Sequence, residues 1–367
     1  MKCIHCAANT NYKTRSANGF RCQGCKREFA FEPKRQSFKI TDESFRRALN
    51  AVSEESTLKF LTEQLWYEVD RRKKRFRWWT DGVWIAVVLA VIVFFSAAAI
   101  ERWWATWALI LAASAVLAGC WLHARLSLKR PPSISLFEFG QLVARWQQIH
   151  GPVPVLSALL LEPYESGLNR SELKEGGEGP YFSFEHAVIT DTRTTAALLI
   201  ENKFHFDHQC IVLCVDGYPF VDWKGVVAML RTNPQLEIAL LHDASVSGCR
   251  LVRRIRQDDW FPELQYRIVD VGLRPSQAES MRLARVESTG APYSHDFDGL
   301  GSKEIRWLEK GYTVSVTTLT PRRMMNAINR NFTRLAAAGA GGSSDDGGIW
   351  YFGGEDGEGD GGEDTFG

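Results

Sequence analysis

Four cysteines near the N-terminus form the pattern with the most specific chemistry in this chain. Cys3-x2-Cys6 and Cys22-x2-Cys25 are two pairs with fifteen residues between them. Each pair on a tight turn directs two thiolates at one point, and two such turns together offer the tetrahedral sulfur shell that suits Zn²⁺. Four ligands leave no open coordination position, so we expect a structural zinc site that folds a ribbon over residues 1–36. The alternatives are a disulfide pair or four unrelated thiols, and we interpret His5 as a bystander.

The expected ribbon is also strongly basic. Its basic side chains include Lys13, Arg15, Arg21, Lys26, Arg27, Lys34 and Arg35, which would attract phosphates. The stretch from Phe20 to Phe29, which contains the second cysteine pair, resembles the second knuckle of transposase-type zinc ribbons. Ribbons of this kind serve as nucleic-acid binders or as protein-docking modules, and both kinds of partner remain open.

Three aspartates mark a second candidate site, because each directly follows a short apolar segment. Asp191, Asp216 and Asp243 come after expected strands over 187–190, 210–215 and 236–241. Apolar strands alternating with helices are typical of a parallel sheet covered on both faces. The carboxyl ends of such strands meet at one edge, where carboxylates bind Mg²⁺ together with a substrate phosphate. The alternative is that each aspartate caps the helix that starts there.

The amino-acid sequence around these aspartates is similar to that of a known family. The runs 187–191, 210–219 (with Asp-Gly-Tyr-Pro) and 239–248 (with His-Asp-Ala-Ser), followed by Gly-Leu-Arg-Pro-Ser at 272–276, resemble the Toprim domain of the topoisomerase VI A subunit and its meiotic relatives. The resemblance covers roughly a quarter to a third of the chain. It implies a Rossmann-like parallel sheet with a Mg²⁺ site, and nucleic acid or a nucleotide as ligand.

The chain departs from that family at the residues that matter for catalysis. The family's glutamate is matched by Asp191 and its first aspartate by Asp243, but its second aspartate is matched by Ser245. We therefore expect a degenerate Toprim-like domain in a binding or scaffold protein that recognises a nucleic acid, a nucleotide or a protein partner. The alternative is a Mg²⁺-dependent nuclease or phosphoryl-transfer enzyme, since Toprim nucleases occur in defence systems.

Two long uncharged segments predict a membrane hairpin. Residues 83–100 and 103–122 contain no charged side chain and are separated only by Glu101 and Arg102. Each approaches the ~20 apolar residues that span a bilayer, and tryptophans cluster at their ends. Basic flanks on both sides predict that both termini are cytoplasmic, with the chain in the inner membrane. The alternative is a buried hairpin of a soluble protein.

The remaining segments complete a multi-domain architecture. Apolar residues at helical spacing predict two amphipathic helices or one long stalk, broken near Ser53. The last residues are rich in glycine and acidic side chains and predict a disordered tail, either solubilising or a docking motif. The formal net charge of +1 identifies no acidic partner, and the other four cysteines are scattered, which suggests a reducing compartment. The expected domains are a zinc ribbon (1–36), a helical stalk (41–77), a transmembrane hairpin (78–125), a Toprim-like α/β domain (133–335) and the tail (336–367).

Overall fold

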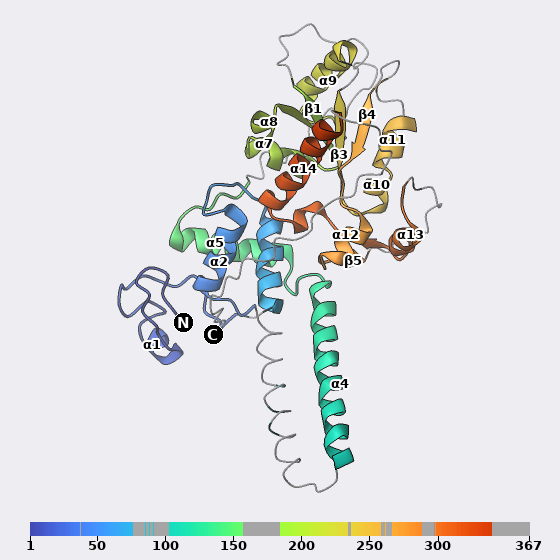
Figure 1. Ribbon diagram of the computed structural model, residues 1–367. Coiled ribbons are helices and arrows are strands. Elements are labelled where there is room, and N and C mark those ends of the chain that lie inside the picture. Colours follow the sequence, from blue (N-terminus) through green and yellow to red (C-terminus); the bar gives the residue numbers. More distant parts are fainter. Residues whose placement is uncertain are drawn as a thin grey trace. The chain divides into compact units, whose positions relative to one another are not determined.

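The structure is a computed structural model, and it divides the chain into two compact units. It describes residues 1–36, 38–75, 103–156, 184–233, 236–257, 266–287 and 299–339, with isolated positions at 85, 88, 91, 261 and 297. The first unit comprises Met1–Ala48 and Trp66–Gly151; the second comprises Leu49–Leu65 and the described residues from Pro152 onward. Figure 1 shows the helices and strands of the chain, coloured along the sequence.

The first unit begins with two cysteine turns joined by a short helix. Helix α1 (Tyr12–Ala17) starts at Asn11, whose side chain accepts a hydrogen bond from the backbone N–H of Thr14. Asparagine is a favoured N-cap because its side-chain oxygen satisfies a backbone donor that the helix leaves free. An antiparallel bridge closes each cysteine turn, Lys2 with Asn9 and Arg21 with Glu28.

Aromatic side chains build the core beside these turns. Helix α2 (Asp42–Ser53) and helix α5 (Leu136–His150) contribute to it. The ring centroids of Phe31 and Phe45 lie 5.0 Å apart, and those of Phe45 and Trp146 lie 4.8 Å apart. Phe45 is fully buried. Helix α2 ends at Ser53, where the sequence predicts a break, and its apolar stripe packs into this core.

A long helix, α4 (Trp103–Leu128), follows the segment predicted to turn at the membrane. Among the described residues, no helix has the length and apolarity to cross a bilayer. The predicted two-span hairpin and the inner-membrane localisation are corrected on this finding. Most of the first predicted span, 83–100, lies outside the described residues.

The second unit contains a parallel sheet of four strands, which include the three that the sequence analysis predicts. The strand order is β2-β1-β3-β4, and every pairing is parallel. The strands are β1 (His186–Thr190), β2 (Cys210–Cys214), β3 (Glu237–Leu241) and β4 (Arg267–Asp270). The helices between and after them are α7 (Arg193–Glu201), α8 (Phe204–Asp207), α9 (Phe220–Thr232), α10 (Val246–Cys249), α11 (Leu251–Gln257), α12 (Pro275–Ser280), α13 (Ser302–Glu309) and α14 (Pro321–Gly339).

Both faces of the sheet are covered, which explains why its strands read as continuous apolar runs. On one face, Ile189 of β1 and Leu240 of β3 pack with residues of α9 and α11. On the other face, Val188 and Ala239 pack with residues of α7 and α14. Successive residues of a strand point to opposite faces, so a strand buried on both sides needs apolar residues at every position.

Two further pieces complete this unit near the carboxyl ends of the strands. Phe60 is fully buried and forms a parallel bridge with Val155. The Gln64 amide donates to the carbonyl of Leu319 at 2.8 Å. A small antiparallel pair, β5 (Val286–Glu287) with β6 (Tyr312–Thr313), leads into a 3-10 turn, η2 (Val316–Thr318). α14 reaches Gly339, so most of the predicted disordered tail lies outside the described residues.

Candidate functional site

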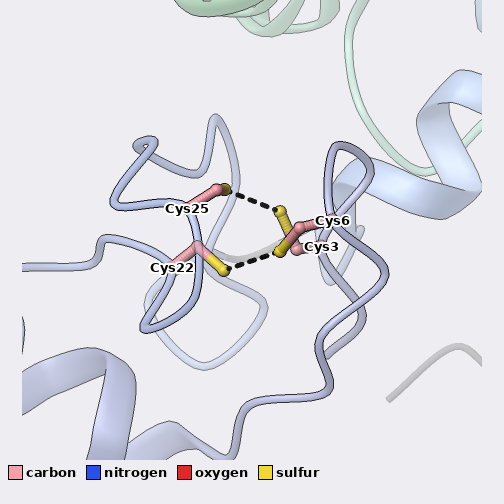
Figure 2. A group of neighbouring side chains, drawn as sticks. All are labelled: Cys3, Cys6, Cys22 and Cys25. Atoms are coloured by element: carbon pink, nitrogen blue, oxygen red, sulfur yellow. Dashed lines mark hydrogen bonds between the residues drawn. The ribbon is translucent and has the colours of Figure 1, made fainter.

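The four N-terminal cysteines gather around one point. Their sulfur atoms all lie within 4.8 Å of one another, close enough to hold a single metal ion. Figure 2 shows one pair facing the other, with Cys3 Sγ 3.6 Å from Cys25 Sγ and Cys6 Sγ 3.5 Å from Cys22 Sγ. These separations exceed the ~2.05 Å of a disulfide bond. The predicted four-cysteine cluster is confirmed, and the disulfide alternative does not fit.

The same backbone turn positions each pair. Cys3 N–H donates to the carbonyl of Ala8 and Cys22 N–H donates to that of Arg27, at 3.0 and 2.8 Å. Ala7 and Lys26, four residues after the first cysteine of each pair, adopt φ values of 59° and 61°. This left-handed conformation costs energy in residues with a Cβ atom, and in both turns it reverses the chain after the second cysteine.

His5 lies beside this cluster and is not part of it, as predicted. Its Nδ1 lies 2.7 Å from the Arg27 guanidinium, and its Nε2 lies 3.3 Å from Nδ1 of His150. Nε2 of His150 lies 2.9 Å from the carboxylate of Asp42, which also accepts the backbone N–H groups of Ala30 and Phe31. A buried carboxylate with these partners fixes the end of the ribbon on α2 and α5.

Two of the three predicted aspartates meet at the carboxyl edge of the parallel sheet. Asp191 follows β1 and Asp243 follows β3, its immediate neighbour. The backbone N–H of Asp243 donates to Oδ2 of Asp191 at 2.7 Å. Oδ1 of Asp243 accepts from the backbone N–H of Val316 at 2.7 Å and from the Ser315 hydroxyl at 3.1 Å. One oxygen of each carboxylate is thus fixed by a backbone donor.

The electrostatics of this pair favour a cation. Burial and the neighbouring charge of Asp243 raise the pKa of Asp191 from 3.8 to about 7. Burial also raises the pKa of Asp243, against the hydrogen bonds from Val316 and Ser315 that lower it. Two carboxylates that share a desolvated site oppose each other's ionisation, and a bound cation relieves that cost.

Sequence reasoning missed a histidine and a carboxylate behind this pair. His242 is almost fully buried, and both of its ring nitrogens face acceptors: Nδ1 lies 2.8 Å from the backbone oxygen of Asp243, and Nε2 lies 3.0 Å from Oδ1 of Asp270. Burial alone would lower the pKa of His242, but the hydrogen bond and charge of Asp270 raise it. The signal was in the sequence, because Asp270 ends β4 as the other aspartates follow their strands.

The backbone at Gly272 passes close to the ring of His242, and the absence of a Cβ atom there leaves space for the ring. A Cβ atom at Gly272 would lie 2.0 Å from Cδ2 of His242, so only glycine fits there without movement. Gly272 N–H also donates to Oδ1 of Asp270 at 2.9 Å. The Gly272-Leu273-Arg274 stretch, which the sequence analysis treated as a motif, therefore has a packing role next to the carboxylate pair.

The other two residues of interest have structural partners. Asp216 follows β2, is exposed, and binds the guanidinium of Arg193 at 2.8 Å. Ser245 is the N-cap of α10, where its hydroxyl oxygen accepts from the N–H of Gly248 at 3.0 Å. Among the described residues, the four cysteines are the one group of three or more histidine, cysteine, aspartate or glutamate side chains that lie within reach of a single metal ion.

Comparisons with known proteins add no family to this description. No protein-family model, curated protein or solved structure matches the chain.

Proposed function

We propose that the four-cysteine cluster holds Zn²⁺ and that the α/β unit binds a divalent cation through Asp191 and Asp243, together with a phosphate-bearing ligand. Zinc is supported by the all-sulfur shell, since soft thiolates in a tetrahedral set suit this ion. Such a site is closed, so its role is to fold the ribbon.

The observation that carries the α/β proposal is the arrangement of the carboxylate pair. Oδ2 of Asp191 and Oδ1 of Asp243 are held by backbone N–H groups at 2.7 Å, so the two side chains have little freedom. Two fixed carboxylates at the edge of a parallel sheet are suited to Mg²⁺, which takes one or two carboxylates and completes its shell with water and phosphate oxygens.

Binding, rather than efficient turnover, is the role we propose for this unit. The Toprim resemblance of the sequence agrees with the placement of Asp191 and Asp243, and it points to a nucleotide or nucleic-acid phosphate as the ligand. The third position of that pattern, Ser245, is engaged in capping α10 and brings no charge. A cation held by two carboxylates has less protein charge around it than phosphoryl transfer commonly uses.

A second candidate, a Mg²⁺-dependent phosphoryl-transfer enzyme, is favoured by one observation. Glu63 is near enough to Asp243 that its charge contributes to raising the Asp243 pKa. Its carboxylate accepts from the Thr317 hydroxyl at 2.9 Å, and Ser315 Oγ lies 3.0 Å from Thr317 Oγ1 and 3.1 Å from Asp243 Oδ1. Glu63 is therefore linked to Asp243 through two hydroxyl groups, and it does not lie within reach of the same ion as the carboxylate pair.

The test uses the zinc-loaded full chain and a fluorescent analogue of ADP as the probe. We expect probe binding that requires Mg²⁺, is lost in Asp243→Asn and is retained in the matched control Asp216→Asn. Asparagine keeps the oxygen that accepts from Val316, so the substitution removes charge with little change of shape. Mg²⁺-independent binding, or equal binding by the two variants, contradicts the proposal. Turnover of the probe that is lost in both Asp243→Asn and Glu63→Gln would establish the enzyme instead.

A further inference from the structure

The exposed face of the ribbon combines cations with aromatic rings. Lys34 Nζ lies 4.7 Å from the ring centroid of Tyr12, and the Arg35 guanidinium carbon lies 4.5 Å from that of Phe20. Both cations are exposed and both rings are half-exposed. Lys13 and Arg21, each next to one of these rings in the chain, are also exposed. We call these six residues the basic–aromatic face.

A buried ion pair holds this face in place. Arg15 Nε donates to Glu32 Oε2 at 2.8 Å and its Nη2 donates to Oε1 at 3.0 Å. The carbonyl of Glu32 accepts from the N–H of Arg35 at 2.9 Å and closes the turn that carries Lys34 and Arg35. The two cations are thus presented by a fixed backbone, which lowers the ordering cost of binding.

The charge balance leaves this face without internal compensation. Residues 1–36 contain eight lysines and arginines and two glutamates. Glu32 pairs with Arg15, and Glu28 pairs with Arg145 of α5. Within the described residues, no carboxylate is found paired with Lys13, Arg21, Lys34 or Arg35. The ligand that fits is therefore a polyanion.

The rings decide which polyanion. We propose that the basic–aromatic face binds single-stranded nucleic acid, with Lys13, Arg21, Lys34 and Arg35 on phosphates and with Tyr12 and Phe20 supporting stacked bases. A cationic track beside aromatic rings is how single strands are bound without sequence preference. An anionic membrane fits less well, because residues 1–36 contribute none of the exposed large apolar side chains found among the described residues. This inference concerns the first unit and does not rest on the cation site.

The test measures anisotropy of a labelled 20-nucleotide oligo-dT with the full zinc-loaded chain, in Mg²⁺-free buffer. Four phosphate contacts predict that log K falls against log salt with a slope of roughly −3, from ~0.7 per phosphate for single strands. Lys34→Ala/Arg35→Ala should bind about tenfold more weakly and with about half that slope. The matched control Lys303→Ala/Lys310→Ala removes two exposed lysines of the second unit and should bind as the native chain does.

A ring variant separates stacking from charge. Tyr12→Ala should weaken oligo-dT binding by about fivefold or more and leave binding to the dT·dA duplex unchanged, with zinc content confirming that the ribbon is folded. Equal loss in the two double variants, or equal binding of single strand and duplex, would overturn the proposal. So would the absence of oligo-dT binding, including the case in which phosphatidylglycerol vesicles bind instead.

Discussion

Replacing Asp191 with asparagine should stabilise the cation-free protein at alkaline pH. The side chain of Asp191 sits against Asp243 with an N–H···O hydrogen bond of 2.7 Å, and asparagine retains an oxygen to accept it. The substitution removes a carboxylate whose ionisation is opposed by burial and by the negative charge of Asp243. Removing that charge should therefore increase the free energy of unfolding.

The size of the gain follows from the pKa of Asp191, which rises from 3.8 to about 7 in the folded state. Between these two pH values the Asp191 carboxyl holds more of its proton in the folded state than in the unfolded state. The contribution of Asp191 to the free energy of unfolding is therefore greatest below pH 4 and falls as pH rises to 7. One pKa unit corresponds to about 1.36 kcal/mol. The advantage of asparagine over aspartate should then grow by about 2–3 kcal/mol between pH 5 and pH 8.

Urea unfolding followed by circular dichroism, in metal-depleted buffer without chelator, measures this difference and leaves the zinc site intact. Asp216→Asn is the matched control at the same sheet edge. It breaks an exposed ion pair with Arg193, so it should cost at most about 1 kcal/mol and show no such growth with pH. The reasoning is refuted if the difference between Asp191→Asn and the native chain is the same at pH 5 and pH 8.

Three other substitutions, one of them with a matched control, test separate parts of the account. Cys22→Ser should reduce the zinc content from one ion per chain to nearly none in metal analysis; a full complement of zinc would contradict the closed site. Gly272→Ala places a Cβ atom 2.0 Å from His242 and should cost about 1–3 kcal/mol or more in urea unfolding. Gly140→Ala in α5, where no atom lies within 4 Å, should instead gain about 0.5–1 kcal/mol, and equal effects of the two would contradict the packing argument. Asp42→Asn leaves one of its two backbone donors without a carboxylate oxygen and should cost about 1–3 kcal/mol; an unchanged urea midpoint would contradict this.

The parallel sheet was predictable because its strands are buried on both faces. The predicted strands at 187–190 and 210–215 agree with β1 and β2 to within one residue at each end. The four-cysteine cluster was equally predictable, because the spacing of the cysteines alone specifies two identical turns. Local sequence determines both features, so neither required knowledge of distant contacts.

What could not be predicted depends on contacts between distant parts of the chain. Glu63 approaches Asp243 only through Thr317 and Ser315, about 250 residues later in the sequence. The partner of the apolar stripe of α2 was likewise set by tertiary packing, since the stripe that includes Phe45 looks the same whether it faces solvent or a core.

The carboxylate pair is tested most directly by titrating Mn²⁺ into the zinc-loaded full chain and counting bound ions by electron paramagnetic resonance. At pH 8 we expect one Mn²⁺ per chain, none in Asp243→Asn, and one in Asp216→Asn. The affinity of the native chain should fall about tenfold per unit as pH drops below about 7, because Asp191 must lose its proton to bind the ion. No bound Mn²⁺ in the native chain, or the same affinity in Asp243→Asn, would contradict the account.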